Sequence, residues 1–300
     1  MSYLDKIFDA RENSISDSSR KLYTRNLKAL HGDGEITSLD FLNDVESICK
    51  KISHLSDNTK KSYIISICTV LKNSNKQDLY DLYFSLLKDF NSKLSVNISK
   101  SDKQEQNWLN QDQVLQLREK LGREVPSKIE ISSHYDKLLN YLLLSLYTML
   151  PPRRNIDYSM MFISNDMTNT NHNYLDIKNK QFIFNNYKTA GKYKTIKIDI
   201  PDDLFNVIKK YLKNHHFKSK LKNKKYEFPF LLTALGTEFT SDGITKRLSK
   251  IFGKKIGSSM LRNIFLSSKY SDVINDLKDD AADMGTSVNT ALNNYIKTDE

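Results

Sequence analysis

The segment that most constrains the fold is the run 135–150, YDKLLNYLLLSLYTML, which is apolar on nearly every side of a helix. A helix without a polar face predicts burial at the centre of a domain, with other elements packed around it. Pro151 and Pro152 end this helix, because proline lacks the backbone N–H that a helix interior uses. The run is shorter than the roughly 18 apolar residues that cross a bilayer, so we expect no membrane partner.

The apolar periodicity divides the chain into two regions. In residues 1–95, which contain no proline, apolar residues recur at intervals of three and four, and this pattern predicts an all-helical domain. Residues 96–107, VNISKSDKQEQN, are polar and aperiodic, as is typical of a linker. We therefore expect a second domain over residues 108–300.

Beyond Pro152 the period changes from that of a helix to that of a strand. Residues 174–178 and 182–184 flank a short turn, and the run 194–200 alternates strictly, with isoleucines on one face. This pattern predicts a small three-stranded antiparallel sheet, so the expected fold class is mainly α with a small antiparallel β-sheet. A helix follows Pro201, and its Lys-rich end at 215–216, His-His, is interpreted as solvated.

Cysteine, histidine and N-terminal patterns narrow the class of protein. Cys49 and Cys68 lie in apolar helical patterns, which are typical of buried thiols in a reducing compartment, so we expect an intracellular location. The six His and two Cys lack metal-ligand spacing, and no metal is expected. The N-terminus, MSYLDKIFDARE, is charged and amphipathic, unlike a secretory signal.

The formal net charge of +10 is concentrated in one segment. Residues 151–270 contain 23 Lys or Arg and 9 Asp or Glu, a net charge of +14, whereas the other 180 residues carry a net charge of −4. Charge gathered in this way favours a polyanionic partner, most simply nucleic acid. The alternative source of part of the excess is codon bias, since 37 of the 46 basic residues are lysine.

Two predicted helix starts, at residues 17–23 and 57–63, share the pattern D-x-[ST]-[KR]-K-x-Y. Each places two cations in the first turn of a helix, where the helix dipole disfavours positive charge. A phosphate group would offset that cost, and the free N–H groups of the first turn favour the same anion. Chance similarity between two capped helices is the alternative. We interpret four residues as DNA contacts, namely Arg20, Lys21, Lys60 and Lys61.

Four segments of the second region follow one another in a defined order. Residues 150–157, LPPRRNID, follow the buried helix, and residues 187–192, YKTAGK, lie between two predicted strands. Residues 259–265, SMLRNIF, begin an apolar helix. Residues 284–287, MGTS, come last, and Tyr295 stands nine residues after the threonine.

Together these segments resemble the tyrosine recombinase and integrase family. The family pattern is an Arg after a buried helix, a Lys in a β-hairpin, an H-x-L-R box, and G-[HW]-S followed nine residues later by Tyr. The resemblance covers the chain from about Trp108 onward, and residues 1–95 look like the family's helical core-binding (SAM-like) domain. The Pro-Pro-x-Arg form of the first segment and the Lys and Asn bias resemble integrases of large DNA viruses and virophages.

The resemblance implies a site-specific recombinase that clamps double-stranded DNA between its two domains. Such enzymes assemble as a tetramer on DNA and need no cofactor. We expect the protein to be intracellular and located at DNA, and the sequence leaves open whether that is in a nucleus or at a cytoplasmic viral replication site. A tyrosine attacks a DNA phosphodiester, leaving a 3′-phosphotyrosine and a free 5′-hydroxyl. The resemblance assigns Tyr295 as this nucleophile. Packing of its ring on a core is the alternative.

The resemblance also assigns the residues that assist the attack. Arg154 and Arg262 would hold the phosphate oxygens with their guanidinium groups, and Lys188 would donate a proton to the leaving oxygen. Arg153 competes with Arg154, which is preferred because the acidic residue three positions later matches the family's R-x-x-[ED]. Lys192 is the second choice for the proton donor. We place both competitors among the DNA contacts.

Two positions depart from the family pattern. Ser259 replaces the His of the box, and Thr286 replaces the His or Trp before the last Ser. Both hydroxyls can donate a hydrogen bond to a phosphate, but neither acts as a base near neutral pH. We therefore expect cleavage slowed by about 10²–10⁴-fold. The alternatives are a type IB topoisomerase, which shares the tyrosine chemistry, and a catalytically decayed recombinase that only binds DNA.

Overall fold

The computed structural model describes residues 2–10, 15–72, 74, 76–93 and 100–297 of the chain. The chain forms two compact units, Met1–Ser99 and Lys100–Glu300. Each unit has its own hydrophobic core, seen as a separate cluster of buried side chains. The fold is mainly helical, and within the described residues the strands all lie in the second unit.

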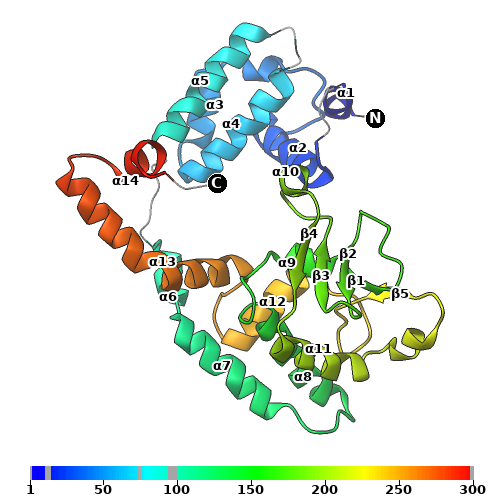
Figure 1. Cartoon of the computed structure of the whole chain (residues 1–300). Coiled ribbons are helices and arrows are strands. Elements are labelled where there is room, and N and C mark those ends of the chain that lie inside the picture. The colour runs from blue at the N-terminus through cyan, green and yellow to red at the C-terminus, as the bar shows by residue number, and fades with distance from the viewer. Residues whose placement is uncertain (1, 11–14, 73, 75, 94–99, 298–300) are drawn as a thin grey trace. The chain divides into compact units, whose positions relative to one another are not determined.

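The first unit is a set of helices packed around a central helix, α4 (Figure 1). Leu27 of α2 and Ile64 and Ile67 of α4 are fully buried at the contact between these helices. Asn26 is buried beside them, and its Nδ2 donates to Ser66 Oγ at 3.0 Å, which satisfies a polar group inside the core. The helices, as the apolar period predicts, are α1 (Tyr3–Asp9), α2 (Asp17–His31), the 3-10 helix η1 (Asp40–Leu42), α3 (Val45–Ile52), α4 (Asp57–Leu71) and α5 (Gln77–Lys93).

The second unit is built around α8 (Ser132–Leu146), a mainly apolar helix that ends at Leu146 and not at Pro151 as predicted. From Leu138 to Leu146 its side chains are buried except for the half-buried Asn140 and Tyr141, and α7, α11 and α12 pack against it (Figure 1). Arg247 of α12 also forms an ion pair with Asp136 of α8. The other helices are α6 (Asp102–Asn107), α7 (Gln111–Glu124), α9 (Asn155–Ser159), α10 (Ala190–Tyr193), α11 (Asp202–Lys213), η2 (Lys218–Lys222), α12 (Ser241–Phe252), α13 (Ser258–Asp283), α14 (Val288–Thr290) and the π-helical turn η3 (Ala291–Tyr295).

The sheet of the second unit is mixed and has five strands among the described residues, so the prediction of a three-stranded antiparallel sheet is wrong. Its strand order is β4-β3-β2-β1-β5, and β1 and β2 run parallel. The three predicted strands are present as β2, β3 and β4, with antiparallel pairing. The strands are β1 (Met161–Ser164), β2 (Asn173–Asp176), β3 (Gln181–Phe184), β4 (Ile196–Asp199) and β5 (Glu227–Pro229).

The two strands that the sequence pattern missed are the ones without alternation. β1 reads MFIS, and three of its four residues are buried, so no polar face marks it as a strand. β5 has three residues and ends at Pro229, which lacks an amide hydrogen for the ladder. β1 and β5 form because they pair with each other, with Ile163 opposite Phe228. A local sequence pattern does not reveal such pairing between distant residues.

Part of the expected linker is helical. Residues 102–107 form α6, which begins after Ser101. Gln104 Oε1 accepts a hydrogen bond from the Ser101 backbone N–H at 2.9 Å, and this contact closes the first turn. Asn107 at the end of α6 accepts a hydrogen bond from the backbone N–H of Lys255 at 2.9 Å, so this short helix belongs to the second unit.

His215, interpreted above as part of a solvated helix end, is instead buried. It is 1% exposed just after α11, and its Nε2 lies 3.2 Å from the carbonyl oxygen of Phe230. Burial disfavours the charged imidazolium and lowers the pKa of His215 to about 4. His216, the next residue, is exposed as expected.

The buried imidazole predicts a pH-dependent loss of stability. Because the folded-state pKa of His215 lies below its unfolded value, its contribution is complete above about pH 6.5 and decreases as the pH falls toward 4. Between pH 7.5 and pH 5.0 the wild type should lose about 2 kcal/mol of unfolding free energy more than His215→Gln. Urea titrations at both pH values measure this difference. His216→Gln is the control and should behave as the wild type; an equal loss in all three proteins would contradict the prediction.

Candidate functional site

Two adjacent arginines after α8 and one arginine of α13 line a common surface pocket. The pocket has a volume of about 340 Å3. Arg153 and Arg154 enter it from the loop that connects α8 to α9, and Arg262 enters it from the first turns of α13. We call it the arginine pocket; its lining residues are Pro152, Arg153, Arg154, Asp157, Tyr187, Thr189, Tyr193, Ile196 and Arg262.

The loop that presents the two arginines is held by the buried amide of Asn155. Its Oδ1 accepts a hydrogen bond from the Tyr147 hydroxyl at 2.6 Å, at the end of α8. Its Nδ2 donates to Thr245 Oγ1 at 2.8 Å and to the Ser241 carbonyl oxygen at 3.2 Å, both on α12. This one amide joins the loop to the end of α8 and to α12. Its buried hydrogen bonds therefore fix the position of the loop relative to both helices.

Arg153 is fixed in place by its neighbours. Its Nε donates to Asp157 Oδ2 at 2.9 Å, and its guanidinium carbon lies 3.8 Å from the centre of the Phe184 ring and 5.2 Å from that of Tyr187. A guanidinium that is paired with a carboxylate and stacked on aromatic rings has little freedom to follow a ligand. Arg153 therefore stabilises the wall of the pocket.

Arg154 and Arg262 make fewer hydrogen bonds and ion pairs than Arg153. Within the part of the chain that the structure describes, the guanidinium of Arg154 has no hydrogen-bond or ion-pair partner. Arg262 donates from Nη2 to Ser259 Oγ at 3.2 Å, while its buried Nε has no partner among the described residues. A buried N–H without a partner costs free energy, which a bound oxyanion would recover.

The electrostatics of the arginine pocket favour an anion. Among the described residues, Asp157 is the one carboxylate that lines it, against three guanidinium groups. Burial raises the pKa of Asp157, and the ion pair with Arg153 and the charge of Arg154 work in the opposite direction. Its Oδ1 is buried without a hydrogen-bond partner in the described part of the chain. Planar guanidinium groups suit the bidentate recognition of a phosphate or carboxylate.

The connection between β3 and β4 forms the opposite wall of the pocket. The Tyr187 hydroxyl donates a hydrogen bond to the Lys194 carbonyl oxygen at 2.8 Å. This contact links the two ends of the connection. Lys188 lies in the connection between two residues that line the pocket, but its own side chain is exposed and does not line it. Lys192 is also outside the lining, with its Nζ 5.0 Å from the centre of the Tyr193 ring.

The remaining predicted catalytic residues lie along and beyond α13. Ser259 is adjacent to the arginine pocket, and its Oγ accepts a hydrogen bond from Arg262. Thr286 and Tyr295 do not line the arginine pocket. From Arg262 to the end of α13 the helix extends about 32 Å, and Thr286 then closes its C-terminus by donating its backbone N–H to the Ala281 carbonyl oxygen at 2.8 Å. Tyr295 is 60% exposed.

In the first unit, the predicted DNA contacts are partly used in internal ion pairs. Arg20 pairs with Asp9 at 2.6 Å and with Asp5 at 3.8 Å, so it ties α2 to α1. Lys60 pairs with the first residue of its own helix, Asp57, at 3.2 Å. Lys21 is exposed and Lys61 is half-buried, and no ion pair engages either of them in the described residues.

The sequence analysis gives no role to five residues of this site, namely Asn155, Tyr187, Thr189, Tyr193 and Ile196. Asn155 orients the loop, and Thr189 and Tyr193 line the pocket. Asn155 directly follows the two arginines and lies just after the proline pair, but nothing else in the sequence distinguishes it from its polar neighbours. Thr189 and Tyr193 carry no signal either, because the turn of the β3–β4 connection decides their direction.

Comparisons of the chain with protein-family models, with curated proteins and with solved structures find no match. Among the described residues, no helix combines the length and the apolar composition that crossing a membrane requires. Over the same residues, no three His, Cys, Asp or Glu side chains lie together in a way that could hold a metal ion.

The different environments of the adjacent arginines predict different effects on stability. Arg153→Gln leaves the buried Asp157 carboxylate without its ion pair and should lower the unfolding free energy by about 3 kcal/mol. Arg154→Gln removes an unpaired side chain and should change it by less than about 0.5 kcal/mol. Urea unfolding followed by circular dichroism measures both changes. Equal effects of the two substitutions would contradict this division of roles.

Proposed function

We propose that the protein is a DNA breaking and rejoining enzyme of the tyrosine-recombinase type, which binds a backbone phosphate between Arg154 and Arg262. The observation that carries the proposal is the arginine pocket, in which these two side chains meet without carboxylate partners of their own. The net charge of +14 over residues 151–270 supports a polyanion as the ligand. Association as a tetramer on paired DNA sites belongs to the same proposal.

The proposed reaction is a transesterification that needs no oxidant, metal or nucleotide. The phenolic oxygen of Tyr295 gives up its proton to solvent water and forms a bond to phosphorus, while the bond from phosphorus to the 5′-oxygen breaks. Lys188 supplies a proton to that leaving oxygen. Arg154 and Arg262 stabilise the negative charge that develops on the two non-bridging oxygens. Rejoining is the same sequence in reverse, with a 5′-hydroxyl as the attacking group.

The proposed reaction requires Tyr295 to reach the arginine pocket, which it does not line. The tyrosine lies in a short helical segment after Gly285, which has a φ of 66° and forms the turn behind α13. Rotation about this turn, or donation of Tyr295 by a second copy of the chain, would bring the phenol to a phosphate in the pocket. DNA binding would supply the free energy for that rearrangement.

A second candidate function is DNA binding without cleavage. Ser259 and Thr286 replace the residues that normally assist the tyrosine, and Tyr295 lies outside the pocket. A protein that retains the phosphate-binding arginines but has lost the catalytic arrangement would have these properties. Covalent trapping on DNA separates the two functions.

The phosphate clamp predicts a specific change in the salt dependence of DNA binding. Arg154→Gln and Arg262→Gln should each lower the slope of log affinity against log salt concentration by about 1, because each removes one phosphate contact. Fluorescence anisotropy with a random-sequence duplex measures the slopes. Arg123→Gln removes the same charge from the exposed end of α7 and is the matched control. Slopes that are the same for all three variants would contradict the clamp.

The nucleophile is tested by trapping a covalent intermediate. The protein is incubated with a pool of nicked duplexes of randomised sequence, in which the short 5′-hydroxyl fragment dissociates after cleavage and prevents rejoining. We expect a denaturation-resistant protein–DNA adduct with the wild type and none with Tyr295→Phe. Tyr193→Phe is the matched control, because Tyr193 is the exposed tyrosine that lines the arginine pocket.

The adduct experiment has three informative outcomes. Absence of any adduct, with DNA affinity intact, would favour the non-cleaving function. Loss of the adduct only in Tyr193→Phe would reassign the nucleophile. Relaxation of supercoiled plasmid of arbitrary sequence by the monomer would identify a type IB topoisomerase.

A further inference from the structure

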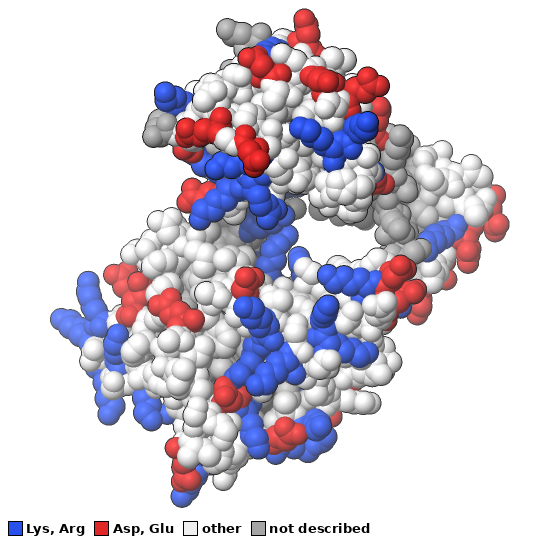
Figure 2. Space-filling view, turned by 180° about the vertical axis from the view of Figure 1, so that it is seen from behind, with Lys and Arg blue, Asp and Glu red and all other residues white. Residues whose placement is uncertain are grey.

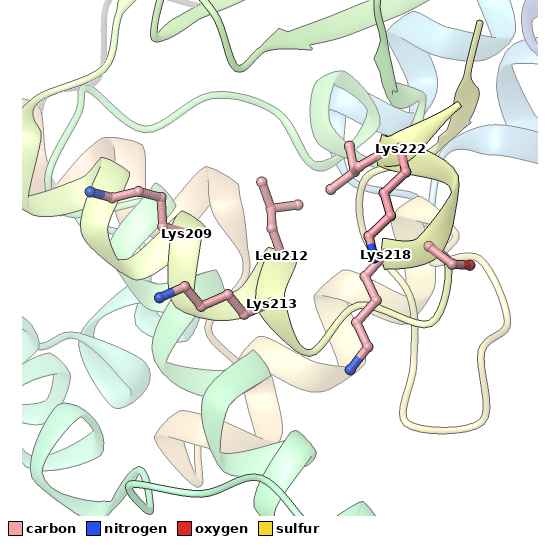
Figure 3. Close-up of a pocket in the computed structure, with 7 residues that line it drawn as sticks. Lys209, Leu212, Lys213, Lys218 and Lys222 are labelled. Atoms are coloured by element: carbon pink, nitrogen blue, oxygen red, sulfur yellow. The ribbon is translucent and has the colours of Figure 1, made fainter. Parts of the chain in front are cut away.

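A second pocket of the same unit, lined by lysines, has no role in the proposed reaction. It lies between α11 and η2 and has a volume of about 480 Å3 (Figure 3). Four lysines, one serine and two leucines line it. We call it the lysine groove; its residues are Lys209, Leu212, Lys213, Lys218, Ser219, Leu221 and Lys222.

The charge of the lysine groove is compensated only in small part, by the interaction of Asp202 with Lys209. Residues 209–225 contain eight lysines and no Asp or Glu. No ion pair involves these eight lysines in the described residues, and their mutual repulsion raises the free energy of the free protein. On the face in Figure 2, Lys and Arg side chains form dense groups on this unit. An anionic partner would remove the repulsion.

The floor of the lysine groove is apolar. In Figure 3 the side chain of Leu212 lies between Lys209 and Lys213 on one side and Lys218 and Lys222 on the other. A phosphate backbone would contact the lysines but leave this floor without apolar contacts. The groove therefore fits an anionic partner that also presents apolar side chains, such as an acidic amphipathic helix.

The chain itself contains a helix of this kind, which is the exposed half of α13, residues 266–283. Its apolar residues Leu266, Tyr270, Val273 and Leu277 are spaced by four, three and four positions, so they form one stripe along the helix. Leu266 is 51%, Tyr270 41% and Val273 63% exposed, whereas Leu277 is half-buried and Ala281, which continues the stripe, is buried. The exposed part of the stripe, residues 266–273, marks a contact surface.

The same half of α13 is acidic. Residues 266–283 contain five aspartates and two lysines. Asp276 and Asp280 follow Val273 and Leu277 by three residues, so at 3.6 residues per turn they border the apolar stripe on one side. None of these aspartates forms an ion pair within the described residues. The aspartates are opposite in charge to the lysines of the groove, and the apolar stripe matches its leucines.

The two surfaces do not meet within one unit. Beyond Ile264, the last fully buried residue of its first half, α13 continues as a regular helix away from α11 (Figure 1). A continuous helix does not bend back on itself, so the groove of the same unit is out of reach. Two copies of α13 would not pair with each other through this face either, because their aspartates would repel.

We propose that the exposed half of α13 docks into the lysine groove of a second copy of the chain. Val273 and Leu277 contact Leu212 and Leu221, and Asp276 and Asp280 pair with Lys213 and Lys218. Each copy then offers one helix and accepts one, so the contact forms reciprocal dimers, closed rings or open chains. It needs neither DNA nor cleavage, and its test is independent of the proposed function.

Charge reversal tests the contact, with assembly measured by sedimentation velocity at low salt and in the absence of DNA. The wild type should self-associate in a concentration-dependent way. The groove variant Lys213→Glu/Lys218→Glu and the helix variant Asp276→Lys/Asp280→Lys should each associate at least about tenfold more weakly, because like charges then face each other. A mixture of the two variants should associate again, since each groove now faces a helix of opposite charge.

Two controls keep the test decisive. The four substituted residues are exposed, so circular dichroism should show unchanged folding. Carbodiimide coupling in a mixture of light and 15N-labelled wild-type protein should join α13 of one copy to residues 209–225 of the other. A wild type that stays monomeric, or a mixture that fails to associate, would overturn the proposal. Loss of DNA affinity by the groove variant with unchanged assembly would make the groove a DNA surface instead.

Discussion

The candidate site depends on one buried ion pair, between Arg153 and Asp157. The carboxylate is 1% exposed, and a charge so far from water is tolerated only with a partner at hydrogen-bond distance. Arg153 supplies that partner and is itself held against Phe184 and Tyr187. The pair therefore connects α9 to the β3–β4 region and gives the arginine pocket a fixed wall.

A fixed wall matters because the neighbouring arginines repel each other. Arg154 and Arg262 share a pocket with Arg153, and only one carboxylate offsets the three charges. Such an arrangement survives without a ligand because Asn155 and the ion pair anchor the surrounding loop to α8 and α12. An oxyanion between these guanidinium groups would offset their positive charge, and this is the physical basis for proposing a phosphate ligand.

The candidate site was predictable to the extent that its residues follow chain order. The family pattern favours Arg154 over Arg153 because an acidic residue lies three positions after Arg154. In the structure that residue, Asp157, forms its ion pair with Arg153, and the Arg154 guanidinium acts on it only through its charge. The assignment of the phosphate contact to Arg154 stays a prediction. The placement of Tyr295 was not predictable, because an offset of nine residues says nothing about the direction of α13.

The sequence alone determined the features that arise from local periodicity and composition. These are the helical N-terminal unit, the buried helix before Pro151, three of the strands and the concentration of positive charge. Only the tertiary structure decided which arginine is paired, that β1 and β2 run parallel, and that His215 is buried while His216 is exposed. The physical reason is the same in each case: pairing and burial depend on residues that are distant in the chain, and a local pattern does not record which of them it will meet.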